Sequence, residues 1–303
     1  MDGVIVVSDL CKDYGPVRAV DDLSFTVGRG EVFALLGPNG AGKTTTVEIL
    51  EGHRTRTSGS VSVLGFDPAT GGRAYRERIG VVLQEAGFDE EFSVRELVAL
   101  YSSLYPRRRD PDEVIELVGL TDKAKAKTKT LSGGQRRRLD LALGLVGDPE
   151  LLFLYEPTTG FDPTARRRAW ELIASLRELG TTILLTTHYM EEAESLADRV
   201  ALLVAGRLVV LGTPASLIAD ELSGEIAFTV PRGLAVSDLP PLGTSTRIEG
   251  PMVVMETTKP TADLLTLTSW AVEQGVELPD LTLSRPTLED VYLRLTGGIG
   301  DDT

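Results

Sequence analysis

A glycine-rich segment near the start of the chain has the residue types and the spacing to hold phosphate. Residues 37–44 read Gly-Pro-Asn-Gly-Ala-Gly-Lys-Thr and fit the pattern G-x-x-x-x-G-K-[ST]. Such glycines let the backbone curl so that N–H groups face a phosphate, while the lysine adds charge and the hydroxyl can ligate Mg2+. A chance match in a chain this long is on the order of one in a hundred. We therefore predict a triphosphate site, with Thr44 as a metal ligand, formed by Gly37, Pro38, Asn39, Gly40, Ala41, Gly42, Lys43, Thr44 and Thr45.

A second short loop also has the composition of an anion site. Ser132, Gly133, Gly134 and Gln135 follow Leu131 and come directly before a helix that we predict to begin at Arg136. A serine at a helix start and the glycine amides beside it can face a negative group. The chain therefore contains two half-sites for phosphate.

The first of these loops follows a buried strand and opens a helix. Residues 31–36 form a short apolar run, and residues 42–51 place apolar side chains at helical spacing. Further strands are predicted at 4–9, 23–27, 151–154 and 181–187, with a helix over 163–179. Because strands and helices alternate, we expect an α/β fold with a parallel sheet and crossover helices.

The pattern indicates two domains. Residues 88–147 are mostly helical and form an insert, with helices predicted at 94–105, 111–118 and 136–146. After Pro214 the character changes to short strands at 226–230, 253–257 and 281–283, interleaved with helices at 262–274 and 286–295. We therefore predict a nucleotide-binding domain over 1–215 and a small α+β accessory domain over 216–303.

Composition excludes several classes of protein. The 31 basic and 45 acidic residues give a net charge of −14, which disfavours a nucleic acid partner because such a partner needs a basic surface. A single cysteine, Cys11, excludes an internal disulfide framework and fits a reducing compartment. The N-terminus lacks the features of a signal peptide, and the apolar stretch 200–211 falls short of the roughly 20 residues of a spanning helix. We expect a cytoplasmic protein whose membrane role depends on a partner.

Both loops, in this order, resemble those of the ABC ATPases, and the resemblance covers about residues 4–215. It implies that residues 37–44 are the phosphate-binding loop, or P-loop, of a nucleotide-binding domain called a cassette. It also implies that this cassette has a mostly parallel sheet, an antiparallel β subdomain and a helical insert. In that family the serine-glycine loop of one subunit closes over ATP held by the P-loop of the other. The resemblance therefore implies ATP and Mg2+ as ligands, and a second nucleotide-binding subunit, identical or different, as a partner.

Four further residues match functional positions of the family. Tyr14 matches the aromatic residue that stacks on adenine, and Gln84 the glutamine that meets Mg2+ and the attacking water. Glu156 matches the general base, and His188 the switch histidine that contacts the γ-phosphate. Taken alone, Tyr14 fits a core tyrosine, Gln84 a surface residue and His188 a structural histidine. Their places relative to the two loops favour the family roles.

The chain departs from the family at Tyr155. The family has an aspartate there, before the glutamate, that orients the inner shell of the metal. A neutral phenol ligates Mg2+ poorly, and losing an outer-shell carboxylate typically costs roughly 10 to 100-fold in metal affinity or activity. The leading hypothesis is an ATPase that energises a transporter, with hydrolysis weakened by Tyr155. The alternative is a subunit of a heterodimer that binds ATP and barely hydrolyses it.

The resemblance narrows the kind of transporter. Residues 286–297 read PTLEDVYLRLTG and look like the tail motif of drug-resistance, ABC-2-type exporter ATPases. This implies a separate permease, a place on the inner face of the membrane, and a drug, antibiotic or lipid as the exported molecule. A soluble ABC protein of translation or DNA repair would need a second cassette, coiled-coil arms or zinc ligands, which the sequence lacks.

The sequence also contains charged runs and a group of apolar residues outside these motifs. The arginine triplets at 107–109, 136–138 and 166–168, and the lysines between 123 and 129, are interpreted as solvated helix faces. The apolar residues Leu97, Leu100, Tyr101, Leu104 and Tyr105 fit a permease docking surface and the core of the helical insert equally well.

Overall fold

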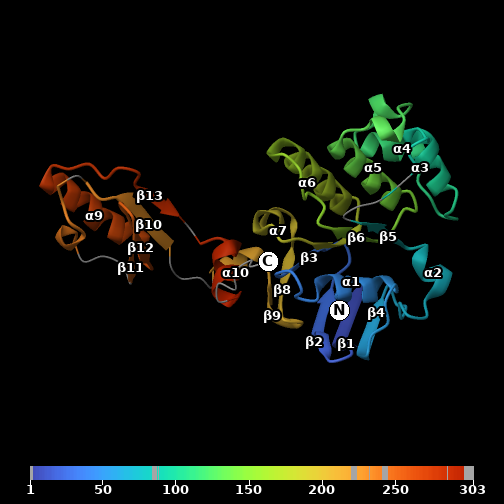
Figure 1. Cartoon of the computed structure of the whole chain (residues 1–303), viewed down its shortest axis with the longest axis horizontal. Helices are drawn as coiled ribbons and strands as arrows, with labels where there is room; N and C mark the ends of the chain where they lie inside the picture. The colour runs from blue at the N-terminus through green and yellow to red at the C-terminus, as the bar shows by residue number, and fades with distance from the viewer. Residues whose placement is uncertain are drawn as a thin grey trace. The chain divides into compact units, whose positions relative to one another are not determined.

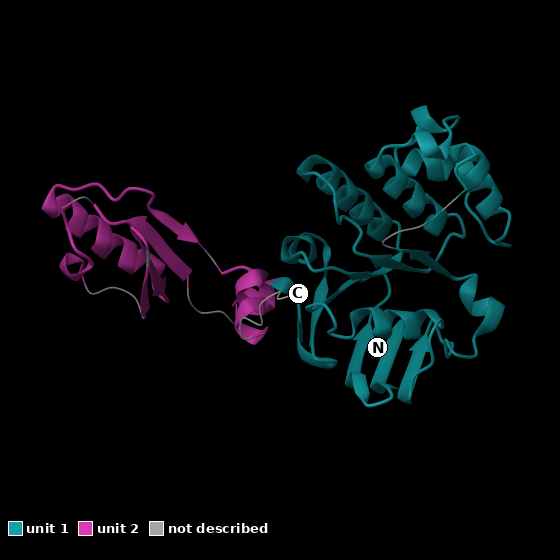
Figure 2. Ribbon diagram, in the orientation of Figure 1, with its two compact units in different colours: residues 1–214, 300–303 teal, residues 215–299 magenta. Residues whose placement is uncertain are grey.

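The computed structural model of the chain describes residues 3–83, 87, 89–219, 224–231, 233–240, 245–284 and 286–296. Its described residues divide into two compact units, one formed by residues up to Pro214 and one by residues between Ala215 and Thr296 (Figure 2). Each unit has a hydrophobic core of its own. The P-loop and the serine-glycine loop both belong to the first unit.

A six-stranded mixed sheet runs through the first unit (Figure 1). In spatial order its strands are β5 (Ile79–Val82), β6 (Leu151–Tyr155), β7 (Thr182–Thr186), β3 (Val32–Leu36), β8 (Arg199–Val204) and β9 (Arg207–Gly212). Neighbouring strands are parallel except β8 and β9, which form an antiparallel hairpin. Every residue of β3 is buried, as expected for a central strand covered on both faces. The predicted α/β class is confirmed.

A second, antiparallel sheet in the same unit consists of β2 (Val17–Val27), β1 (Ile5–Tyr14) and β4 (Ser58–Val63), in that order. The first two strands are longer than the predicted 4–9 and 23–27. Their pairing shifts register between Val7 and Leu10 and again between Leu10 and Lys12. These irregularities interrupt the two-residue alternation, so the sequence pattern indicates only part of each strand.

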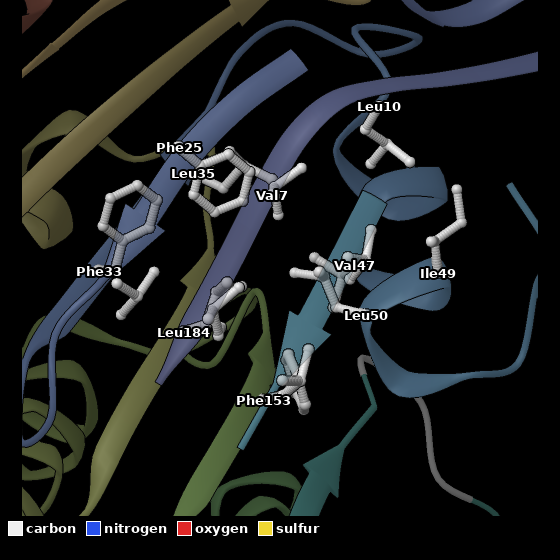
Figure 3. Close-up of a cluster of buried hydrophobic side chains, with 14 of the residues drawn as sticks. Val7, Leu10, Phe25, Phe33, Leu35, Val47, Ile49, Leu50, Phe153 and Leu184 are labelled. Atoms are coloured by element: carbon white, nitrogen blue, oxygen red, sulfur yellow. The ribbon is translucent and has the colours of Figure 1, made fainter. Parts of the chain in front are cut away.

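Helix α1 (Lys43–Glu51) lies between the two sheets and packs its apolar side chains on both (Figure 3). Val47, Ile49 and Leu50 of α1 are almost fully buried. The core around them includes Val7, Leu10 and Phe25 of the antiparallel sheet, and Phe33, Leu35, Phe153 and Leu184 of the mixed sheet. Each such side chain stabilises the fold by about 1.5–3 kcal/mol through burial. The start of α1, which carries Lys43, is therefore held rigidly against β3.

The remaining helices of the first unit are α2 (Gly72–Arg76), α3 (Val94–Ser102), α4 (Pro111–Leu117), α5 (Gly133–Leu145), α6 (Pro163–Glu178) and α7 (Met190–Leu196). Two 3-10 turns cover Thr121–Lys123 and Thr128–Thr130. Helices α3, α4 and α5 pack together beside the β5 edge of the sheet (Figure 1). Helix α6, the longest described, has 16 residues, and no described helix is both long and apolar enough to cross a membrane.

The second unit has a four-stranded antiparallel sheet covered by a helix. Its strand order is β11 (Ser245–Glu249), β12 (Met252–Thr257), β10 (Gly224–Thr229) and β13 (Thr282–Ser284). Helix α9 (Pro260–Gln274) packs Leu267 against Ile226, Phe228, Val253 and Met255 of the sheet. Helices α8 (Pro214–Ala219) and α10 (Leu288–Thr296) and a 3-10 turn at Val236–Asp238 complete the described elements. Strand β11 is not predicted from the sequence.

Candidate functional site

The loop between β3 and α1 forms a cradle whose shape depends on glycine. Gly37 has a φ of 148°, and a Cβ there would lie 2.2 Å from the carbonyl oxygen of Leu203. Gly42 has a φ of 96°, and a Cβ there would lie 2.4 Å from the carbonyl oxygen of Ala19. Any larger residue at either position would displace backbone. The glycine spacing of the motif therefore follows from close approach between backbone segments.

Lys43 is buried inside this loop. Its Nζ donates to the carbonyl oxygens of Gly37 and, at 3.0 Å, Pro38. Burial lowers the pKa of the Lys43 ammonium, and the nearby carboxylate of Glu156 acts in the opposite direction. An ammonium that the loop carbonyls already hold is placed to move onto phosphate oxygens, which are stronger charged acceptors.

One pocket brings the loop together with the end of β6. It has a volume of about 260 Å3 and is lined by Ala19, Asn39, Gly40, Ala41, Gly42, Lys43, Thr44, Thr45, Tyr155, Glu156 and Thr186. Seven of the nine predicted P-loop residues are in this lining. Gly37 and Pro38 lie beneath it and contact Lys43 through their carbonyls. The fold therefore places a carboxylate, a lysine and a helix N-terminus around one space.

Glu156 stands in a turn with unusual backbone geometry. Its φ is 42°, a left-handed conformation that few residues other than glycine adopt. The backbone N–H donates to the carbonyl of Thr186, and the carboxylate accepts from the hydroxyl of Thr159 at 3.1 Å. His188 Nδ1 lies 3.3 Å from Glu156 Oε1. Glu156 and His188, two of the three predicted catalytic residues, are therefore adjacent, and together they can orient and deprotonate a water.

Tyr155 lines the pocket, but its hydroxyl is bonded to the end of α1. Its hydroxyl donates to Glu51 Oε2 over 3.1 Å, at the far end of α1 from Thr44. Burial, followed by the charge of Glu51, raises the pKa of this phenol well above its usual value, so the group is neutral. The phenol of Tyr155 is therefore not available as an anionic ligand.

The donors in the pocket fit Mg2+ only in company with phosphate. The described residues contain no cluster of three or more His, Cys, Asp or Glu side chains that could hold a metal. Mg2+, however, typically binds through one or two protein oxygens, substrate phosphates and waters. Thr44 can supply such an oxygen from the pocket lining. The second predicted ligand, Gln84, lies outside the described residues.

The serine-glycine loop lies apart from this pocket. Ser132 is the N-cap of α5: its hydroxyl accepts from the N–H of Gln135, and the Gln135 side chain accepts from the N–H of Ser132. This capping box starts α5 at Gly133, three residues before the predicted Arg136. Ser132 and Gly133 are exposed, and none of the four loop residues lines the P-loop pocket of the same chain.

Tyr14 is the last residue of β1, the central strand of the antiparallel sheet, and is also absent from the pocket lining. It is 38% exposed, with Lys12 Nζ at 5.0 Å and the Arg54 guanidinium at 5.3 Å from its ring centroid. The core alternative is therefore wrong. Stacking on adenine stays a prediction.

Two residues near the site were missed or misassigned. The interpretation of residues 136–138 as a solvated face is wrong for Arg137, because its side chain is half-buried and its guanidinium donates to backbone carbonyls of two segments, Leu83 and the turn at residues 155–157. Glu51 is fully buried at the end of α1 and pairs with Tyr155 and His53. No local pattern marks the pairing of Glu51 with Tyr155 or the contacts of Arg137, because these partners are distant in sequence. By contrast, Arg107 and Arg109 pair with Asp148 at the surface.

The five residues considered for docking separate into two groups. Leu97 is buried in the helical insert, whereas Leu100 and Leu104 are exposed. Tyr101 and Tyr105 line a groove of about 400 Å3. The opposite side of this groove is lined by residues of the first unit outside the helical insert, which we call the cassette core, including Glu51, His53, Arg76 and Leu83. The groove therefore lies between the helical insert and the elements that carry the nucleotide pocket.

Comparison with known proteins agrees with this geometry. A family model described as ABC transporter matches residues 20–159, and one described as ABC transporter domain-containing protein-like, C-terminal domain, matches residues 224–287. The daunorubicin resistance ATP-binding protein of Streptomyces coeruleorubidus is 40% identical over 98% of this chain and 96% of its own length. The Nod factor export ATP-binding protein I of Rhizobium meliloti is 42% identical over 97% and 88%.

Solved structures give the same result for the first unit. The structure described as the ATP-binding subunit of an ABC transporter aligns with a TM-score of 0.64 and 26% identity, over 72% of this chain and 92% of its own. A subunit of the cbiONQ complex from Clostridium perfringens aligns with a TM-score of 0.66 and 28% identity, over 73% and 92%.

Proposed function

The chain belongs to the ABC transporter family as an ATP-hydrolysing subunit of the exporter type, and from this premise we propose how its residues use ATP and which partners they serve. ABC ATP-binding subunits dimerise and work with a transmembrane permease. We propose that two cassettes, at least one of them this chain, close over ATP with Mg2+ at the inner face of the membrane. The relatives support the hypothesis of an ATP-hydrolysing exporter subunit. They give no support to the alternative of a subunit that binds ATP and barely hydrolyses it.

The observation that carries the proposal is the pocket shared by Lys43 and Glu156. The two groups come from different βα connections of one sheet and face the same space. A lysine beside a helix N-terminus holds the β- and γ-phosphates of ATP. A carboxylate on the opposite wall can take a proton from the water that attacks the γ-phosphorus.

Each residue then has a defined task. The P-loop amides and Lys43 bind and orient the triphosphate, and Thr44, with Gln84 by resemblance, would hold Mg2+. When bound, Mg2+ neutralises charge that develops on the phosphate oxygens. Glu156 accepts the proton from water, and His188, whose Nδ1 lies 3.3 Å from the Glu156 carboxylate, fixes this group and, by resemblance, contacts the γ-phosphate. Ser132, Gly133, Gly134 and Gln135 complete the site of the second subunit, because they are absent from the pocket of their own chain.

We place the permease in the groove between the helical insert and the cassette core. Tyr101 and Tyr105 supply aromatic contact area there. Glu51 Oε1 and Asp140 Oδ1, whose side chains also line the groove, are buried and have no hydrogen-bond partner among the described residues. A basic side chain of the permease would satisfy the Asp140 oxygen. By similarity to the daunorubicin resistance and Nod factor export proteins, the exported molecule is a drug, an antibiotic or a lipid.

The test is hydrolysis by the purified chain. We expect Mg2+-dependent release of phosphate from ATP. Glu156→Gln should lower kcat by about 10^2–10^4-fold and keep ATP affinity, because only the proton acceptor is lost. Lys43→Ala should abolish ATP binding itself. Lys129→Ala, at an exposed lysine paired with Glu91, is the matched control and should change neither quantity. Unchanged hydrolysis in the Lys43→Ala and Glu156→Gln variants would contradict the proposal.

A further inference from the structure

The side chain of Arg137 links its own helix, α5, to two other segments. These are Leu83, which follows β5, and residues 155–157, which we call the catalytic turn because it carries the predicted general base, Glu156. The Arg137 side chain projects from the first turns of α5, whose N-cap is Ser132 of the serine-glycine loop. Its Nη2 donates to the carbonyl of Tyr155 at 2.6 Å and to that of Glu156 at 3.4 Å. Its Nε donates to the carbonyl of Pro157 at 3.2 Å, and its Nη1 to the carbonyl of Leu83.

These carbonyl acceptors belong to, or lie next to, residues with predicted catalytic roles. Tyr155, Glu156 and Pro157 form the turn that presents the general base, and Leu83 directly precedes Gln84 in the sequence. The guanidinium contacts only backbone atoms of these residues in the hydrogen bonds given above. Through these hydrogen bonds it sets where the turn stands.

The backbone of Glu156 explains why such a clamp is needed. A non-glycine residue in the left-handed region costs about 1–3 kcal/mol and persists only where surrounding contacts fix it. The φ of Glu156 is 42°, and its peptide is held by Thr186 on one side and Arg137 on the other. The Arg137 side chain is itself desolvated: burial lowers its pKa, while the charges of Asp140, Glu192 and Glu156 act in the opposite direction. Planar geometry with five donors suits arginine, and not lysine, to this task.

We propose that Arg137 is a positioning residue that couples the serine-glycine loop to the catalytic turn of the same subunit. The inference rests on the proposed dimer, in which that loop contacts ATP held by the second subunit. A shift of α5 when the loop meets this ATP moves the guanidinium, and the guanidinium moves the backbone of Glu156. Occupancy of one composite site thereby alters the general base of the other.

Adjacent Arg138 offers a matched control. It lies on the same helix and also donates to backbone carbonyls, at 2.7 Å to Gly119 and 3.4 Å to Val118. These acceptors belong to the end of α4 in the helical insert, away from the catalytic turn. Arg138→Gln therefore removes the same chemical group from the same helix without touching Glu156.

The experiment compares Arg137→Gln, Arg137→Lys and Arg138→Gln in the full chain. Steady-state hydrolysis gives kcat, KM and the Hill coefficient for ATP, and a fluorescent ATP analogue gives the dissociation constant. For Arg137→Gln we expect kcat to fall about 10 to 100-fold, because several charge-assisted hydrogen bonds are lost. The Hill coefficient should fall from near 2, the limit for two sites, to near 1, and nucleotide affinity should stay within about twofold.

Arg137→Lys keeps the positive charge beside Asp140 and Glu192 but cannot bridge three segments. The lysine variant should fold like the unsubstituted chain, and its Hill coefficient should still fall toward 1. The test therefore remains valid even if Arg137→Gln fails to fold. Arg138→Gln should keep both kcat and the Hill coefficient. Equal losses in the Arg137 and Arg138 variants, a Hill coefficient that Arg137→Lys leaves unchanged, or a coefficient of 1 in the unsubstituted chain would overturn the coupling role. Failure of the unsubstituted chain to hydrolyse ATP would instead refute the proposed function.

Discussion

Replacing Glu51 by glutamine should change how the stability of the cassette depends on pH. The Glu51 side chain is 1% exposed, and its Oε2 accepts a hydrogen bond from the Tyr155 hydroxyl and lies 3.1 Å from His53 Nδ1. Burial, the largest cause, raises the pKa of the carboxyl to about 8, with the charge of Glu48 adding to the rise and the Tyr155 hydrogen bond opposing it. In the unfolded chain the same group has an ordinary pKa near 4.3.

The sign follows from where the proton resides. Between about pH 4.5 and 8 the folded chain keeps a proton on Glu51 that the unfolded chain releases. The free energy of unfolding therefore falls as the pH rises through this window, by at most about 1.4 kcal/mol per pH unit. From pH 5.5 to 7.5 the loss is at most about 2.7 kcal/mol. Glutamine has nearly the same shape and no proton to lose, so Glu51→Gln should not show this contribution.

The assay is urea denaturation of the two proteins at pH 5.5, 6.5 and 7.5, both carrying Trp270→Phe. Trp170 of α6 is then the sole tryptophan, and its fluorescence reports on the first unit. The difference in unfolding free energy between Glu51→Gln and its parent should grow with pH in favour of glutamine. As a control, both proteins are also compared with His53→Ala added, so that the neighbouring imidazole cannot cause the pH dependence of the unfolding free energy. A difference that stays constant, or grows in favour of glutamate, would refute a buried, protonated Glu51.

Three further changes test single parts of the site. Tyr155→Asp should raise Mg2+-dependent kcat several-fold, since it restores a carboxylate near the metal, and an unchanged rate over a Mg2+ titration would show that this position is not limiting. Gly42→Ala should weaken ATP binding at least about tenfold by equilibrium titration, because its Cβ would lie 2.4 Å from the carbonyl of Ala19; normal affinity would mean that the cradle is not tight. His188→Ala should lower kcat about 10^2-fold while the affinity for a fluorescent ATP analogue stays within twofold, and a large loss of affinity would assign His188 to binding.

The parts of the fold that the sequence predicts are those governed by local patterns. Strand β3 and helix α1 follow from a continuous apolar run, a glycine and a helical period, and the P-loop pocket forms around them. Strands β1 and β2 are only partly predicted because register shifts at Leu10 and Lys12 break the alternation. Strand β11 carries charged and polar residues and forms by pairing with β12, which no local signal reveals.

The candidate site shows the same division. The resemblance predicts roles for Glu156 and His188 at the ends of two strands, and the structure places the two side chains 3.3 Å apart. Arg137 could not, since a run of three arginines has the pattern of a solvated face and its acceptors lie far away in sequence. The pairing of Glu51 with Tyr155 likewise depends on how α1 packs against β6. Contacts between distant segments, not residue types, decide these roles.

The central claim is that each ATP site combines the P-loop of one subunit with the serine-glycine loop of another. Mixing two inactive variants of this chain, Lys43→Ala and Ser132→Arg, tests it directly. If the chain forms homodimers, half of the dimers in an equal mixture are mixed, and each of these contains one intact site, so hydrolysis should rise clearly above that of either variant alone, up to about a quarter of the unsubstituted rate if the two sites acted independently. If the mixture hydrolyses ATP no faster than the average of the two variants alone, shared sites between copies of this chain are contradicted.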